Sequence, residues 1–257
     1  ILLASLINRV LHETGAQLAS FAGGSKDNAI PREVCAVLVC SDADIEKAQS
    51  IAEAMAADFA AELVPFEPDF KCMISVKDGA AEVLSEADAK AFISAICLAP
   101  NGVRRRNLKQ DGFVVTSLNL GVARMDDTTA SLVFAPRSSV ASLQNYTTDC
   151  LYLLAETFGF DCDIAGAYPG WSFAEESPIR DTFIASYREL FDADLKIEAI
   201  HAGLECGLFS DALPGLDAIA VGPTIRGCHT PDEYLPLDSF ERFYSLLTDV
   251  LSRLAKH

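Results

Sequence analysis

The order of helix-like and strand-like segments in the first two thirds of the chain is the feature that most limits its fold. Apolar residues recur there with helical spacing or alternate with strand spacing, in the order helix, strand, strand, helix, strand. This order occurs twice, with negligible sequence identity between the two halves. Two such units predict a doubled ferredoxin-like domain. The predicted helices are 1–14, 42–63, one from Ser85 and 140–158, and the predicted strands are 17–23, 33–40, 71–79, 112–125, 129–137 and 162–170.

Residues near the helix starts support two of these assignments. Ser41 stands directly before the Ala-rich segment and is a candidate N-cap. The sequence "SEAD" from Ser85 has the form of a capping box in which Asp replaces the usual Glu. Both patterns predict a helix that begins at the next residue.

The sequence changes character near Gly166, where helices and apolar strands begin to alternate. We therefore predict an α/β protein with two domains, an α+β domain over residues 1–165 and an α/β segment over residues 166–257. In open α/β sheets, functional residues lie in the loops at the strand ends. The predicted elements of the second part are a helix after Pro178, strands at 195–200 and 216–222, and a last helix from about Leu237.

Charge and composition exclude several classes of partner. The chain has 37 acidic and 20 basic residues and a formal net charge of -17, so it repels nucleic acid and anionic membranes. No apolar run approaches the roughly 20 residues that span a bilayer. The eight cysteines include no CxxC pair, which is typical of reduced cysteines in a cytoplasmic protein. We expect a cytoplasmic protein that acts on small molecules.

The stretch "IHAGLECGLF" at 200–209 allows several readings. His201 and Glu205 are four residues apart, which on one helix face would suit a metal pair, although Gly203 and Gly207 make a regular helix doubtful. The stretch could equally be a structural turn, or a loop whose backbone N–H groups bind a substrate anion while Glu205 faces a substrate amine. A Cys206 nucleophile with His201 as its base is a weaker reading.

Three further positions attract attention. His229 lies in an irregular loop with Glu233 four residues on, which suits a metal ligand held by a neighbouring carboxylate, or a plain surface loop before the last helix. Arg137 ends an apolar run, and an arginine at a strand end can bind a carboxylate through its planar guanidinium, or simply be solvated. The "VRRR" cluster at 103–106 is expected to be a solvated hairpin loop.

Taken together, six segments in this order and spacing resemble the aminoacyl-histidine dipeptidases, or Xaa-His dipeptidases, a subfamily of the co-catalytic zinc peptidases. The combination of "HAGLECG" with "GP" and "GCHTPDE" carries most of the specificity. The six segments are "GGSKDNAIPRE" at 23–33, "APNGVRRR" at 99–106, "TSLNLGV" at 116–122, "GAYPGW" at 166–171, "HAGLECGLF" at 201–209 and "GPTIRGCHTPDE" at 222–233.

The resemblance implies a fold and a set of roles. Residues 1–165 would be an enlarged, doubled lid domain, and residues 166–257 the C-terminal part of a zinc-peptidase catalytic domain. The substrate would be a dipeptide with C-terminal histidine, hydrolysed by a water that two zinc ions activate. His229 would be a zinc ligand. The residues that the resemblance places at the substrate are Asn28, Asn119, Arg137, Gly203 and Glu205.

The chain departs from the family pattern in one respect. The family's other zinc ligands and its catalytic Glu belong to motifs of the HxDxV and Glu-Glu type, and these motifs do not occur in this sequence. We therefore expect a C-terminal piece that has no catalytic residue of its own, is inactive alone and binds no zinc tightly. The alternative is a non-catalytic ferredoxin-like module for binding or dimerisation, and a homodimer is possible in either case.

Overall fold

A computed structural model describes most of the chain, namely residues 1–108, 112–126, 128–198, 201, 204–228 and 232–255. The chain divides into two compact units, which are described separately below. Unit 1 comprises Ile1–Asn107, Val114–Arg137 and Ser142–Ala165, and unit 2 comprises Leu108–Phe113, Ser138–Ala141 and Gly166–His257.

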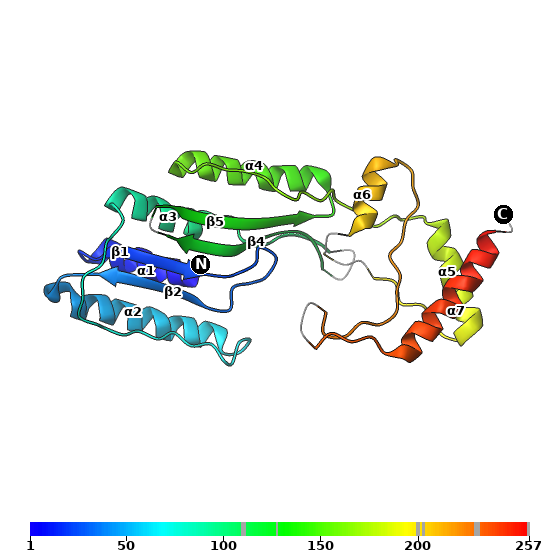
Figure 1. The fold of residues 1–257 in the computed structure, drawn as a ribbon, viewed down its shortest axis with the longest axis horizontal. Helices are drawn as coiled ribbons and strands as arrows, with labels where there is room; N and C mark the ends of the chain where they lie inside the picture. Colours follow the sequence, from blue (N-terminus) through cyan, green and yellow to red (C-terminus); the bar gives the residue numbers. More distant parts are fainter. Residues whose placement is uncertain (109–111, 127, 199–200, 202–203, 229–231, 256–257) are drawn as a thin grey trace. The chain divides into compact units, whose positions relative to one another are not determined.

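Unit 1 is built around an antiparallel sheet (Figure 1). The strand order is β2-β1-β4-β3, and β5 also pairs with β4. β1 pairs along its length with β2 but meets β4 only at its end, through Ala22↔Arg124 and Gly23↔Ala123. The elements are α1 (Leu2–Glu13), β1 (Gln17–Gly23), β2 (Val34–Val39), α2 (Asp42–Leu63), α3 (Glu86–Leu98), β3 (Gly102–Asn107), β4 (Phe113–Met125), β5 (Ala130–Ser138) and α4 (Ala141–Phe158).

The core of unit 1 lies where α1 and α3 meet the sheet. Helical spacing places Ala4 and Ile7 on the buried face of α1, next to buried residues of α3 such as Ile93. Phe21 of β1 and Phe92 of α3 are almost fully buried and pack edge to face, with 5.5 Å between ring centroids. The first half of unit 1 is thus joined to the second through this aromatic contact.

The predicted helix starts are confirmed, but the capping contacts differ in detail. The hydroxyl of Ser85 accepts a hydrogen bond from the backbone N–H of Asp88 at 3.1 Å and donates to the Asp88 carboxylate at 2.7 Å. Ser41 is the N-cap residue of α2, but its hydroxyl donates to the carboxylate of Asp44 and makes no capping bond to the backbone. Ser85 therefore satisfies an orphan N–H group at its helix start, and Ser41 does not.

Two strand predictions in the first two thirds of the chain are wrong. Residues 71–79 and 162–170 form no strand. In the first segment Cys72 packs against the core between α1 and α2, but Met73 is 91% exposed and the segment has no strand partner among the described residues. In the second, Gly166 has a φ of 62° and Pro169 has no N–H group, and both features interrupt a ladder.

The arginine cluster at 103–106 is also corrected by the structure. It belongs to β3, Gly102–Asn107, and is not a hairpin loop. The side chains from Val103 to Arg106 are exposed, so the charges are solvated although the backbone is part of the sheet. The charged side chains of this segment hid the strand from a prediction based on apolar alternation.

Unit 2 contains the helices α5 (Pro178–Phe191), α6 (Glu205–Ala212) and α7 (Leu237–Leu254). α5 packs against α7 through the buried residues Phe183, Leu246 and Val250. Ser177 caps α5 by accepting a hydrogen bond from Arg180 N, while the carboxylate of Asp217 accepts from Ser177 Oγ at 2.6 Å and from Ile179 N at 2.9 Å. Two side chains therefore satisfy the first N–H groups of α5.

The two strands predicted in the second part are not found. Residues 195–198 and 216–222 are irregular, and residues 199–200 lie outside the described residues. Among the described residues from Gly166 onward, the backbone pairing outside helices is a single bridge between Arg226 and Tyr234. A strand persists only where another strand accepts its hydrogen bonds, and this part of the chain supplies none.

The mixed α/β class predicted from the sequence is confirmed, and all eight cysteines are free. In the part of the chain that the structure describes, no helix has the length and apolarity needed to cross a membrane.

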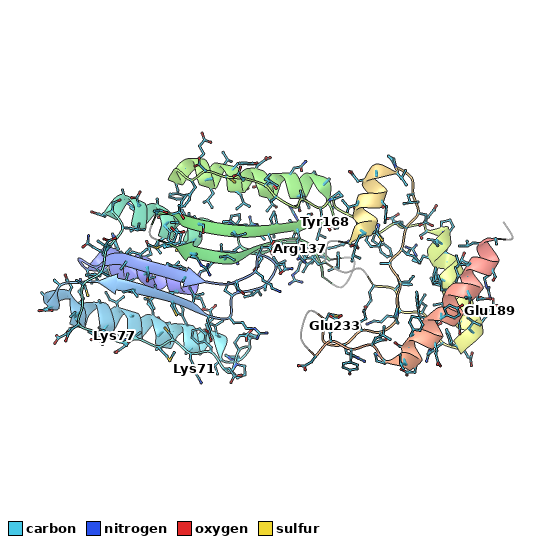
Figure 2. All side chains as sticks on the ribbon, in the orientation of Figure 1. Lys71, Lys77, Arg137, Tyr168, Glu189 and Glu233 are labelled. Carbon is cyan, nitrogen blue, oxygen red and sulfur yellow. The ribbon has the colours of Figure 1, made fainter. Side chains whose placement is uncertain are left out.

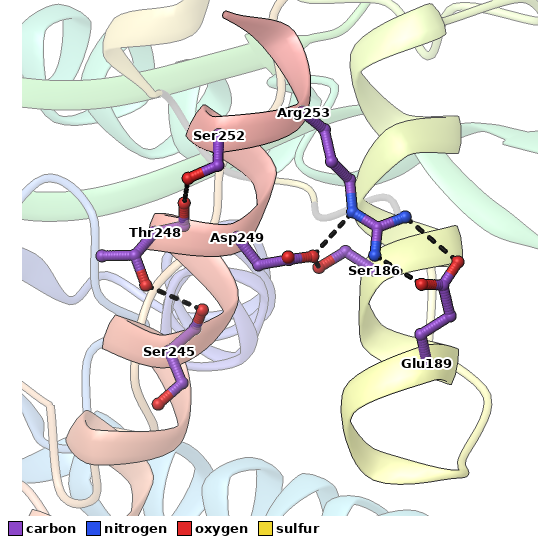
Figure 3. Close-up of polar contacts among 7 residues, drawn as sticks. All are labelled: Ser186, Glu189, Ser245, Thr248, Asp249, Ser252 and Arg253. Carbon is purple, nitrogen blue, oxygen red and sulfur yellow. Dashed lines mark hydrogen bonds and ion pairs between the residues drawn. The ribbon is translucent and has the colours of Figure 1, made fainter. Parts of the chain in front are cut away.

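A polar network links α5 to α7 beside their apolar contact (Figure 3). Ser186, which is fully buried, donates a hydrogen bond of 2.6 Å to the carboxylate of Asp249. Arg253 donates to the same carboxylate at 2.7 Å and forms a two-bonded ion pair with Glu189 at 2.6 and 3.1 Å. The exposed hydroxyl of Ser245, in contrast, bonds only to a carbonyl of its own helix.

We predict that Ser186→Ala destabilises unit 2 by about 1–2 kcal/mol, because the half-buried carboxylate of Asp249 loses the hydrogen bond from the Ser186 hydroxyl. The matched variant Ser245→Ala removes an exposed, helix-internal hydroxyl and should change stability by less than about 0.5 kcal/mol. Urea unfolding can be followed through Trp171, the only tryptophan of the chain and a residue of unit 2. Equal effects of the two substitutions would contradict a structural role for the Ser186 contact.

The ion pair of Glu189 should make unit 2 sensitive to acid. Hydrogen bonds from Arg253, and then its charge, lower the pKa of Glu189 below its ordinary value. A carboxylate with a lowered folded-state pKa stabilises the fold above its unfolded pKa of about 4.3, and this contribution disappears as the pH falls through the folded-state pKa. The stability difference between the parent chain and Glu189→Gln should therefore be largest near pH 7 and vanish in stronger acid. A difference independent of pH would exclude this linkage.

Candidate functional site

Asn119 and the loop that carries Asn28 lie together in unit 1. Asn119 is on β4, and its Nδ2 donates to the carbonyl oxygen of Asp27 at 2.7 Å and to that of Ala29 at 3.0 Å. These two carbonyls flank Asn28, which is exposed in the turn after β1. The structure thus brings two of the predicted substrate residues together, although they are far apart in the sequence.

Two glycines allow the loop to touch β4 directly. Gly24 has a φ of 76°, and a Cβ atom there would lie 1.8 Å from the carbonyl oxygen of Gly121. A Cβ atom on Gly121 would in turn lie 2.4 Å from the carbonyl oxygens of Lys26 and Asp27. Both positions therefore require glycine, for backbone angle at Gly24 and for space at both. The sequence reading missed this role, although the glycine inside the strand-like "TSLNLGV" was a possible sign of close backbone approach.

Arg137 lies at the end of β5 and is half-buried (Figure 2). Next to it, the carbonyl oxygen of Pro136 accepts a hydrogen bond of 3.2 Å from Gln144 Nε2, which ties the strand end to α4. Arg137 has no hydrogen bond or ion pair with any other residue that the structure describes. An unpaired guanidinium of this kind can bind a planar carboxylate through two parallel hydrogen bonds.

In unit 2 the segments 166–171 and 201–209 come together. Gly207 lies inside α6 and is buried, and a Cβ atom on it would lie 2.8 Å from the carbonyl oxygen of Pro169. Gly170 makes a similarly close approach to the backbone of Ser139, whose carbonyl also accepts a hydrogen bond from Ser172. Glycine at 207 is thus needed for packing, and it does not prevent a helix.

This geometry corrects the reading of His201 and Glu205 as a helical metal pair. Glu205 is the first residue of α6 and Leu204 is its N-cap, so His201 precedes the helix. The two side chains therefore do not share a helix face. Glu205 is exposed at the helix start, and Gly203 lies outside the described residues.

The loop that contains His229 is closed at its base by backbone pairing. Arg226 N donates to Tyr234 O at 2.9 Å, and Tyr234 N donates to Arg226 O at 3.0 Å. Ser239 on α7 accepts a hydrogen bond from the N–H of Thr224, which fixes the segment before the loop. His229 itself lies outside the described residues, whereas Glu233 is described and precedes α7 (Figure 2).

The described residues do not form a metal site of their own. No group of three or more His, Cys, Asp or Glu side chains in the described part of the chain is arranged to hold a metal ion. A zinc site therefore does not fit the described residues alone.

A cavity of about 220 Å³ in unit 1 is separate from these residues. It is lined by Pro100, Arg104 and Arg105 near β3, Thr116 of β4, and Leu143, Tyr146, Thr147 and Cys150 of α4. None of the predicted substrate residues lines it.

Comparison with known proteins gives relatives that match this chain over nearly its whole length. No family model matches the chain. The chain is 34% identical over 244 residues to the cytosol non-specific dipeptidase of Escherichia coli (strain K12), covering 94% of the chain and 50% of that protein.

A solved structure supports the same relationship. The crystal structure of aminoacylhistidine dipeptidase from Vibrio alginolyticus superposes with a TM-score of 0.85 at 32% sequence identity. The match covers 97% of this chain and 52% of that one, so the chain spans about half the length of both relatives. In sequence and in fold, this chain is therefore similar to about half of the length of these two dipeptidases.

Proposed function

We propose that this chain is the substrate-binding part of a cytoplasmic zinc dipeptidase that hydrolyses dipeptides with C-terminal histidine. The observation that carries the proposal is the match over 97% of the chain to an aminoacylhistidine dipeptidase, together with six family-like segments in the same order. Residues 1–165 would act as the lid and residues 166–257 as part of the catalytic domain. The catalytic residues and most zinc ligands would come from the half that the chain does not match.

Arg137 would bind the C-terminal carboxylate of the dipeptide. Arg137 is a half-buried residue at the end of β5 and has no partner among the described residues, so its guanidinium is free to pair with a ligand carboxylate. Asn28, exposed in its loop, would supply a neutral hydrogen-bonding group on the same lid, and Asn119 belongs to the same region of the lid. A charged bidentate contact should contribute more to affinity than a neutral one.

In unit 2, Glu205 and Gly203 would line the substrate pocket, and His229 would be one zinc ligand. The support is the "HAGLECG" and "GCHTPDE" sequences and the exposed position of Glu205 at the start of α6. Because the described residues hold no metal site by themselves, we assign zinc binding to this chain only jointly with other ligands.

The irregular segments of unit 2 support the same proposal. Residues 195–198 and 216–222 have strand-like sequences but no strand partner in the described part of the chain, and Ile197 and Val221 are exposed. Apolar strands of this kind are buried on both faces in α/β sheets. Strands from the other half of a dipeptidase would pair with the backbone N–H and C=O groups of these segments.

We predict that His229→Ala, made in the proposed full-length dipeptidase that joins this chain to the half it does not match, abolishes hydrolysis of β-alanyl-histidine and lowers the bound zinc content. Loss of one ligand opens the metal site, whereas a loop position contributes little to the core. Zinc analysis, activity and circular dichroism measure the three properties. Normal zinc content and turnover in the variant would refute the ligand assignment. Absence of Xaa-His hydrolysis in the unsubstituted protein would refute the proposed function itself.

We predict that Arg137→Lys in the same protein raises the KM for Xaa-His dipeptides about ten- to a hundredfold, more than Asn28→Ala does. Lysine keeps the charge but cannot form the two parallel hydrogen bonds, and loss of one charge-assisted bond costs about 1.5–3 kcal/mol. Steady-state kinetics on the free acid and on the dipeptide amide measure the effect.

The amide substrate and a second arginine provide the controls. The amide has no carboxylate, so Arg137→Lys should change its KM little. Arg104→Lys replaces another arginine on a strand of unit 1 and should leave both substrates unaffected. If Arg137→Lys impairs hydrolysis of the amide as much as that of the free acid, Arg137 has a structural role and does not bind the carboxylate.

A further inference from the structure

Both amide hydrogens of Asn119 form hydrogen bonds within the protein. Its Nδ2 donates to the carbonyls of Asp27 and Ala29, on either side of Asn28. A side-chain amide nitrogen has two hydrogens, so no donor remains on Nδ2 for a ligand. We propose that Asn119 is a positioning residue that fixes the Asn28 loop for the dipeptide and does not itself donate to the substrate. This inference rests on the proposed function, because it assumes that Asn28 faces the dipeptide.

The two hydrogen bonds from Asn119 order a loop whose tip is exposed to solvent. The side chains from Ser25 to Ile30 are exposed, and the backbone bond within this turn, from Ala29 N to Lys26 O, is long at 3.4 Å. An exposed turn of this kind would otherwise sample many backbone conformations. Fixing the carbonyls before and after Asn28 restricts the backbone on both sides of the residue proposed to meet the substrate.

Close contacts between the loop and the backbone of β4 also restrict the loop. Gly121 lies against the carbonyls of Lys26 and Asp27, and Gly24 lies against the carbonyl of Gly121. Asn28 remains exposed while the backbone on either side of it is held. A group ordered before binding loses less conformational entropy when the ligand arrives.

The chemistry of position 119 requires an amide. Aspartate has nearly the same shape, but it would place a carboxylate oxygen against two carbonyl oxygens, all of which are acceptors. Asn119→Asp therefore turns an attractive contact into a repulsive one with almost no change in side-chain volume. Asn119→Ala removes the contact without adding charge, and it decides the question if the Asp variant does not fold.

The experiment uses the protein that joins this chain to its other half, and it measures loop order and dipeptide binding separately. Amide hydrogen exchange reports the order of residues 24–31. Calorimetry with β-alanyl-histidine on metal-free protein reports binding without turnover, and steady-state kinetics report KM and kcat. Asn145→Asp, an exposed asparagine on α4 in the same unit, is the matched control.

For Asn119→Asp and Asn119→Ala we expect exchange in the loop to accelerate about tenfold or more, and KM and the dissociation constant to rise about tenfold, since two hydrogen bonds are lost. kcat should stay within about threefold, because Asn119 does not touch the reacting atoms. In an Asn28→Ala background, Asn119→Ala should add no further change in KM. Asn145→Asp should alter none of these quantities.

Each of the following outcomes would overturn the proposal. A loosened loop with unchanged dipeptide affinity would make Asn119 a structural residue only. Additive effects of Asn28→Ala and Asn119→Ala on KM would mean that Asn119 acts on the substrate independently of Asn28. Failure of the unsubstituted protein to bind the dipeptide would reject the proposed function together with this inference, whereas normal binding in the parent and in both Asn119 variants rejects this inference alone.

Discussion

The sheet of unit 1 is continuous only through the short antiparallel contact between β1 and β4. Only Ala22↔Arg124 and Gly23↔Ala123 are paired, yet the contact joins the two halves of the sheet. Phe21, directly before it, packs against Phe92 of α3 and buries the junction. Because the loop with Asn28 leaves β1 at this point, its backbone necessarily runs alongside β4 and meets Asn119. A rigid sheet thereby positions an exposed loop, which is a common way of building a binding site.

The helices of this fold could be predicted from the sequence because their signals are local. The periodicity over 42–63 and the "SEAD" sequence at Ser85 place α2 and α3 without any knowledge of their partners. The strands at 71–79 and 216–222 were predicted wrongly, because an alternating apolar pattern does not reveal whether another strand is available to pair with it. α6 was doubted on account of Gly207, which is instead explained by a contact with the distant Pro169.

The candidate site was predictable only in part. Asn28 and Asn119 were selected through family resemblance, and Arg137 also through its position at the end of an apolar run. The structure places the two asparagines together, and Arg137 lies at a strand end. The hydrogen bonds of Asn119 could not be foreseen, since they join residues about 90 positions apart. The predicted metal ligand His229 stays a prediction, because it lies outside the described residues.

The central claim is that this chain binds the carboxylate end of a dipeptide through the lid. A crystal structure of the proposed full-length dipeptidase, bound to a non-hydrolysable phosphinic analogue of an Xaa-His dipeptide, tests it most directly. The account predicts that the analogue's terminal carboxylate lies within hydrogen-bonding distance, about 2.7–3.0 Å, of the guanidinium of Arg137, with Asn28 in contact with the ligand. An analogue whose carboxylate is bound elsewhere, with Arg137 and the Asn28 loop facing solvent, would contradict the account.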